Sequence, residues 1–231
     1  MSNSYRSYRI DVFLEFFRKA LGNVNNYYYN SHLWIEQRLN DQLPEGKKKY
    51  RNEIEDYLYG YGERVFCYEL YHQVRLLMKK VDESEPEMFR DVLFQGELKK
   101  DDIDKIIESY DNVKSLKHRY IPDFILHSPG NFECQDIVIE VKSNPELTFS
   151  HIKDDLLKIH EFISSYTYKR GVFLTINNEP DKMHKMLTKS DNVEWIKQCL
   201  PKRENILFMC KQQNDKQLFE RNLHELNQVT G

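Results

Sequence analysis

The chain has 231 residues, and its 34 Lys and Arg residues against 37 Asp and Glu residues give a formal charge of −3. This length allows one domain with an extension or two small domains. The charge argues against a polybasic protein that coats nucleic acid with its whole surface, although it leaves room for a local basic groove. The 15 Tyr and 13 Phe residues are too many for a disordered chain.

The sequence also bears on where the protein works. No stretch approaches the about 18 consecutive apolar residues of a membrane span, and the first residues lack the apolar region of a signal peptide. The four cysteines form no C-x-x-C pair, so neither a zinc site nor a disulfide framework is indicated. They are Cys67, Cys134, Cys199 and Cys210. We therefore expect a cytoplasmic protein with reduced thiols and no membrane partner.

Residues 1–56 are predicted to form an N-terminal helical segment. Apolar residues at helical spacing predict a helix over 8–21, which Gly22 ends, and a second helix over 31–43. The short basic stretch 47–51 is either a solvated loop or a segment that contacts phosphate. These helices carry more apolar surface than one short hairpin can use, so we expect them to pack on the core, to form a homodimer or to dock a protein partner.

Residues 57–231 are predicted to form an α/β domain in which short apolar strands alternate with helices. Helices are expected at about 62–80, 101–110, 149–168, 182–198 and 215–227. Strands are expected at about 88–99, 120–127, 136–143, 171–177 and 205–210. This alternation is typical of a mixed β-sheet flanked by helices.

Two of these strands carry ionisable residues within apolar runs. Asp123 lies in the strand over 120–127, and Glu140 and Lys142 lie in the strand over 136–143. Side chains two residues apart point to the same face of a strand, so Glu140 and Lys142 are neighbours, while Ile139 and Val141 point to the core. The short connection suits an antiparallel hairpin, which brings Asp123 beside Glu140.

This set of charges is costly at a sheet edge unless it is neutralised. A salt bridge between Lys142 and one acid leaves the other acid without a partner. A hard divalent cation, Mg²⁺ or in its place Mn²⁺, resolves the problem because it prefers oxygen ligands. Such an ion activates water and stabilises charge on a phosphate, and Lys142 would orient or deprotonate that water.

Pro122-Asp123 followed by Glu140-Val141-Lys142 resembles the PD-(D/E)xK motif of restriction-endonuclease-like nucleases. The resemblance covers about residues 57–211. It implies a restriction-endonuclease-like fold in which Asp123, Glu140 and the backbone carbonyl of Val141 bind Mg²⁺ while Lys142 positions the attacking water. It further implies phosphodiester cleavage, of DNA rather than RNA, in restriction, repair or defence against foreign DNA.

Nucleases of this kind usually carry a glutamate on the helix that precedes the sheet. At about 100° per residue, Glu63 lies within about 60° of Phe66, Leu70 and Val74, on the stripe that faces the sheet. Glu69 lies about 240° round and is the reserve candidate. Glu63 is therefore predicted as a catalytic residue and a further metal ligand. Glu97, near a strand end, is either another ligand or an exposed acid.

Other residues have alternative interpretations. On the helix after the motif, Lys153, Lys158 and His160 either face the substrate cleft or are solvated, and His118-Arg119 either contacts phosphate or forms an exposed basic turn. An alternative to a nuclease is a catalytically idle nuclease-like module that binds nucleic acid or a protein partner within a larger assembly. A third alternative is a structural α/β protein with a coincidental motif.

Overall fold

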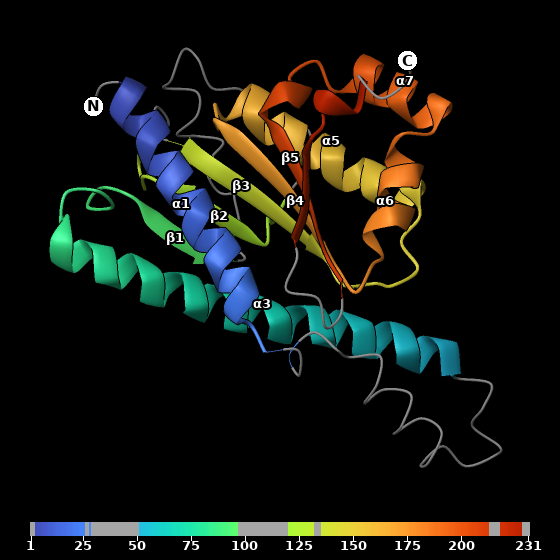
Figure 1. Ribbon diagram of the computed structural model, residues 1–231, viewed down its shortest axis with the longest axis horizontal. Helices are drawn as coiled ribbons and strands as arrows, with labels where there is room; N and C mark the ends of the chain where they lie inside the picture. Colours follow the sequence, from blue (N-terminus) through green and yellow to red (C-terminus); the bar gives the residue numbers. More distant parts are fainter. Residues whose placement is uncertain are drawn as a thin grey trace.

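The described residues form a six-stranded mixed β-sheet with helices on both faces, which confirms the predicted α/β class (Figure 1). The computed structural model describes residues 3–25, 28, 51–96, 120–131, 135–212 and 218–227, with the backbone alone for 3, 51–61, 82 and 227. The strand order across the sheet is β1-β2-β3-β4-β5-β6. The described helices pack their apolar faces on the two sides of this open sheet.

Consecutive strands pair in chain order. The strands are β1 (Leu93–Gly96), β2 (Phe124–His127), β3 (Gln135–Lys142), β4 (Arg170–Ile176), β5 (Ile206–Lys211) and β6 (Leu218–Asn222). β1, β2 and β3 are antiparallel, β3, β4 and β5 are parallel, and β6 returns antiparallel to β5. The parallel pairs need long crossovers, which the helices after β3 and β4 supply.

One face of the sheet is covered by α1 (Asn3–Asn23) and α3 (Arg51–Ser84). Phe13 and Phe17 of α1 and Phe66 of α3 are fully buried in a shared apolar layer against the sheet. In Figure 1, α1 crosses the sheet and α3 runs along its lower border. The boundary expected at residues 56 and 57 falls inside α3, and α1 contributes directly to the core of the sheet domain.

The opposite face is covered by α5 (Phe149–Ser165), α6 (Pro180–Leu187) and α7 (Ser190–Cys199). Ile152, Leu156 and Ile159 recur at helical spacing and are fully buried beneath α5. The helix approaches β4 so closely that a Cβ at Gly171 would overlap the Ile159 side chain. The glycine is therefore required for this helix to seat on the strand.

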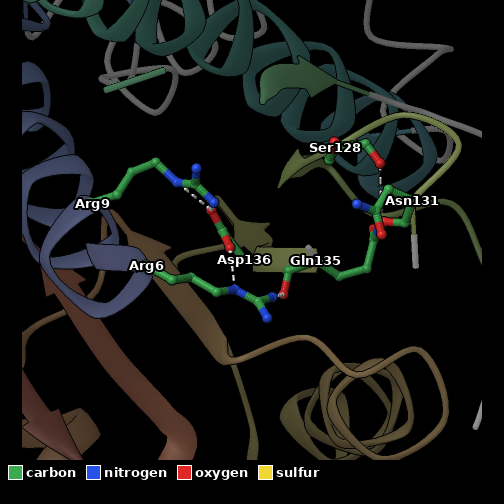
Figure 2. Close-up of polar contacts among 6 residues, drawn as sticks. All are labelled: Arg6, Arg9, Ser128, Asn131, Gln135 and Asp136. Atoms are coloured by element: carbon green, nitrogen blue, oxygen red, sulfur yellow. Dashed lines mark hydrogen bonds and ion pairs between the residues drawn. The ribbon is translucent and has the colours of Figure 1, made fainter. Parts of the chain in front are cut away.

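A buried ionic cluster fastens α1 to the start of β3 (Figure 2). The carboxylate of Asp136 accepts hydrogen bonds from Arg6 Nε at 2.7 Å and Arg9 Nε at 2.8 Å. Arg6 Nη2 also donates to the Gln135 carbonyl at 2.6 Å. The β2–β3 register shifts between Leu126 and His127, opposite Asp136, and a bulge of this kind re-aims a side chain. The bulge directs Asp136 to the α1 face of the sheet.

Two expected elements were wrong. The helix expected over 215–227 is replaced by β6 and the 3₁₀ turn η6 (Glu225–Asn227). Pairing with β5 and the edge contact of Phe219 with Phe208 override local helix preference. The helix expected over 182–198 is two helices, because α6 ends where Thr188 Oγ1 donates back to the His184 carbonyl at 2.8 Å. The 3₁₀ turn η5 (Arg203–Asn205) then leads into β5.

Several sequence predictions lie outside the described residues. They are the helices over 31–43 and 101–110, the basic stretch 47–50, Glu97, His118-Arg119 and Cys134. The described cysteines Cys67, Cys199 and Cys210 are free thiols, as expected. None of the described helices is long and apolar enough to cross a membrane.

Candidate functional site

The carboxyl end of β3 brings the two motif halves together. Phe124 pairs with Ile139 in the antiparallel β2–β3 ladder, so Asp123, one residue earlier, lies opposite Glu140. This register confirms the predicted hairpin. Ile139 and Val141 pack in the layer beneath α1 and α3, also as expected, which turns Glu140 toward α5.

Asp123 is held by the backbone of β3. Its Oδ2 accepts a hydrogen bond from the Val141 N–H at 2.7 Å. The N–H and C=O groups of one strand residue point to the same side, so the Val141 carbonyl also faces the Asp123 side of β3. Burial raises the pKa of the Asp123 carboxyl above its ordinary range, and this hydrogen bond together with Lys142 opposes part of that rise.

Glu140 is 1% exposed and pairs with a lysine from α5. Lys158 Nζ lies 2.8 Å from both carboxylate oxygens of Glu140 and donates to the Ile121 carbonyl at 2.7 Å. Only the contact with Oε2 has hydrogen-bond geometry, so Oε1 is buried without a hydrogen bond from the described residues. Burial and the charge of Asp123 raise the pKa of Glu140 well above its ordinary value, despite Lys158.

Lys142 lies beside Glu140 on the same face and is surrounded by acids. Its Nζ is 3.4 Å from Asp155 Oδ2 of α5. Burial alone would lower the pKa of Lys142, but Asp155, Glu63 and the two motif acids outweigh it and raise the pKa. The side chain is therefore a protonated ammonium at neutral pH. A cation of this kind orients and stabilises negative oxygens and does not abstract a proton.

Glu63 reaches the same place from α3, on the other side of the sheet. Its Oε2 accepts a hydrogen bond from the Ser143 N–H at 2.8 Å, directly after the end of β3. Burial raises the pKa of the Glu63 carboxyl, with Asp123 adding to the rise and Lys142 opposing it. Glu69, the reserve candidate, instead accepts a hydrogen bond from Gln73 Nε2 on its own helix at 2.7 Å. The structure thus brings Glu63 to the strand end.

The helix after the motif contributes two further residues, Asp155 and Lys158. Of the three residues considered there, Lys158 alone contacts a motif acid, because Lys153 lies over the rings of Phe149 and Trp195, at 5.2 and 5.1 Å from their centroids. His160 Nε2 contacts Ser164 at 3.4 Å. Sequence reasoning missed Asp155. Helical spacing could have indicated this residue, because Asp155 and Lys158 both border the buried stripe of α5 on the same side.

The site is not a ready-made metal centre. Within the ranges that the structure describes, no three His, Cys, Asp or Glu side chains converge closely enough to hold an ion. The donors are nevertheless of the type that Mg²⁺ prefers, namely two coupled carboxylates and a backbone carbonyl. The buried Glu140 Oε1 accepts no hydrogen bond from the part of the chain that the structure describes, and its carboxylate already attracts one cation, the Lys158 ammonium. These residues fit a divalent cation provided that Lys158 moves away from Glu140.

Comparisons with known proteins add no relative. No family model, curated protein or solved structure matches the chain.

Proposed function

We propose that the protein is a Mg²⁺-dependent nuclease of the PD-(D/E)xK class that hydrolyses phosphodiester bonds, in DNA rather than RNA. The observation that carries the proposal is the placement of Asp123 opposite Glu140, with Lys142 next to Glu140 on the same face of β3. In a nuclease of this class, two acids and one lysine are needed in that arrangement at the end of a strand.

The order of elements supports the same proposal. A long helix (α3) precedes three antiparallel strands (β1, β2, β3), and α5 then leads to the parallel strand β4. This order resembles the core of the restriction-endonuclease-like fold. Glu63 on α3 supplies the acid that such nucleases usually carry on the preceding helix, and its bond to Ser143 brings it to the motif.

The chemistry follows from the donor set. Asp123, Glu140 and the Val141 carbonyl would hold Mg²⁺ or Mn²⁺, with Glu63 as a further ligand. When bound, the ion supplies Lewis-acid activation of water and stabilises charge on the phosphate. Lys142 donates hydrogen bonds to the attacking water or to a phosphate oxygen, because its raised pKa keeps it charged. Asp155 holds the Lys142 ammonium in place from α5.

One observation favours a second candidate function. The Lys158–Glu140 ion pair is nearly buried, with side-chain exposures of 14% and 2%. If it persists in the working protein, Lys158 replaces the metal ion permanently. The protein would then be a catalytically idle nuclease-like module that binds nucleic acid or a protein partner. Restriction, repair and defence against foreign DNA remain the proposed settings for an active enzyme.

Cleavage assays separate these possibilities. Supercoiled plasmid and single-stranded DNA and RNA are incubated with the protein and Mg²⁺ or Mn²⁺, or with EDTA. The nuclease proposal predicts metal-dependent cleavage that Asp123→Ala abolishes. Nucleic-acid binding without cleavage would support the idle module instead. Cleavage that Asp123→Ala leaves intact would place the active site elsewhere.

A further inference from the structure

Between positions 62 and 81, the solvent side of α3 carries exposed basic residues and no exposed acid. Every exposed charged residue between positions 62 and 81 is basic, namely Arg64, Arg75, Lys79 and Lys80. The two acids of this stretch, Glu63 and Glu69, are half-buried and engaged by Ser143 and Gln73 respectively. The chain as a whole has a charge of −3, so this helix face departs in sign from the rest of the molecule.

Helical spacing places five of the exposed residues in one row. At about 100° per residue, the row covers an arc of about 80° on the side of α3 that faces away from the sheet. We call it the α3 basic stripe, and it consists of Arg64, Tyr68, His72, Arg75 and Lys79. At about 1.5 Å per residue it extends over about 22 Å. Phe66, Leu70 and Val74 lie on the buried side of the helix.

The stripe has the composition of a nucleic-acid contact rather than of a merely solvated helix face. Arg75 and Lys79 make no ion pair with any residue that the structure describes, so their charge is available to an anion. Between them and Arg64 stands Tyr68, which is 63% exposed. Basic side chains that track phosphates, interleaved with an aromatic ring that packs on sugar or base, are typical of nucleic-acid binding surfaces.

The stripe begins one residue after Glu63, about 100° round the helix from it. Arg64 directly follows Glu63, whose carboxylate accepts the Ser143 N–H at the end of β3. A nucleic-acid strand lying along the stripe therefore has one end within a helical turn of Glu63, the residue that joins α3 to the end of β3. No other described element combines this proximity with a run of exposed basic residues.

We propose that the α3 basic stripe binds the phosphate backbone of duplex DNA, with Arg64 at the end of the stripe nearest the strand end that carries Asp123, Glu140 and Lys142. The choice of DNA as the anionic partner rests on the proposed nuclease function. The binding surface itself rests on the charge, exposure and spacing of α3. Each strand of a DNA duplex advances about 3.4 Å per nucleotide, so the stripe matches about six nucleotides of one strand.

The test is the salt dependence of DNA binding. Binding of the full chain to a fluorescent duplex is followed by anisotropy in EDTA, which prevents cleavage, over a series of salt concentrations. Each phosphate contact contributes about −0.9 to the slope of log K against log salt. Arg75→Gln combined with Lys79→Gln should therefore make the slope shallower by about 1.8. Circular dichroism confirms that the variant is folded.

A matched control removes two exposed lysines from another helix. Lys182→Gln combined with Lys185→Gln on α6 changes the net charge equally and should leave the slope as in the wild type. An unchanged slope in the α3 variant, or the absence of duplex binding by the wild type, would overturn the proposal. Loss of binding to anionic phospholipid vesicles without loss of DNA binding would also overturn it, because the stripe would then contact a membrane.

Failure of the stripe and failure of the nuclease proposal give different results. If the α3 variant has a shallower salt slope but the wild type does not cleave DNA with Mg²⁺, the stripe is a DNA-binding surface and the nuclease proposal is wrong. If the wild type cleaves DNA with metal but the α3 variant has an unchanged salt slope, the nuclease proposal is supported and the stripe is not the DNA-binding surface.

Discussion

Lys158 of α5 holds its ammonium 2.8 Å from both carboxylate oxygens of Glu140 on β3. The lysine thus occupies the position beside Glu140 that the proposed Mg²⁺ needs. It neutralises a carboxylate whose burial would otherwise be costly, and it must leave before Glu140 serves as a metal ligand. The pair therefore links the stability of the metal-free protein to its affinity for metal.

The first prediction concerns Lys158→Met, which removes the competing ammonium and keeps most of the side-chain volume. Without metal, the variant should lose about 3 kcal/mol of unfolding free energy, because Glu140 is left buried without its ion-pair partner. It should bind Mn²⁺ more tightly than the wild type, by about tenfold or more. Urea unfolding in EDTA and calorimetric titration with Mn²⁺ measure the two effects. Weaker Mn²⁺ binding would show that Lys158 assists the ion and does not compete with it.

The second prediction is a pH dependence that originates at Glu140. Its pKa is raised in the fold, mainly by burial and by Asp123, so the folded state binds the proton more tightly than the unfolded state does. The folded state is therefore favoured below the ordinary glutamate pKa, and this contribution is lost as the pH rises through the raised value. As the pH rises above the ordinary glutamate pKa and toward the raised one, the metal-free wild type should lose stability relative to Glu140→Gln.

Urea unfolding of both proteins in EDTA at several pH values measures this difference. Groups away from the site titrate equally in the two proteins, so the difference reports Glu140 together with the groups coupled to it, mainly Asp123 and Lys158. A difference that stays constant with pH would show that Glu140 ionises as readily in the fold as in the unfolded chain.

The third prediction concerns the attachment of α1. Asp136→Asn leaves Arg6 and Arg9 buried without their shared carboxylate (Figure 2) and should lower the unfolding free energy by about 3–5 kcal/mol. The control is Glu220→Gln, which breaks the pair with Arg18 at side-chain exposures of 40% and 27%. This exposed pair should contribute less than about 1 kcal/mol. Equal effects of the two substitutions would contradict a structural role for the buried cluster.

The parts of the site that the sequence predicted are those that depend on local geometry. The two-residue period of a strand and the short β2–β3 connection were enough to place Asp123 opposite Glu140. In the same way, the 100° step of a helix distinguished Glu63 from Glu69. Both inferences need only the regular repeat of one element and the pairing of its neighbour.

The parts that the sequence did not predict depend on how distant elements meet. Asp155 and Lys158 reach the motif because α5 lies close against β4 at Gly171, a packing position that no local pattern encodes. The Arg6 and Arg9 contacts depend on the bulge opposite Leu126 and His127, which turns Asp136 to the α1 face. β6 was mistaken for a helix because its strand form comes from pairing with β5.

The nuclease function is tested most directly by Mg²⁺-dependent cleavage of a labelled DNA duplex by the wild type and by Lys142→Met. The variant keeps most of the side-chain volume but removes the ammonium. The proposed nuclease function predicts cleavage by the wild type that EDTA stops, and a loss of at least about a hundredfold in rate for Lys142→Met, at unchanged duplex binding in EDTA. A matched variant, Lys153→Met, should cleave like the wild type, because Lys153 packs on Phe149 and Trp195, away from the motif. Equal cleavage by the wild type and Lys142→Met would contradict the role of Lys142, and no cleavage by the wild type with any divalent cation would contradict the nuclease function.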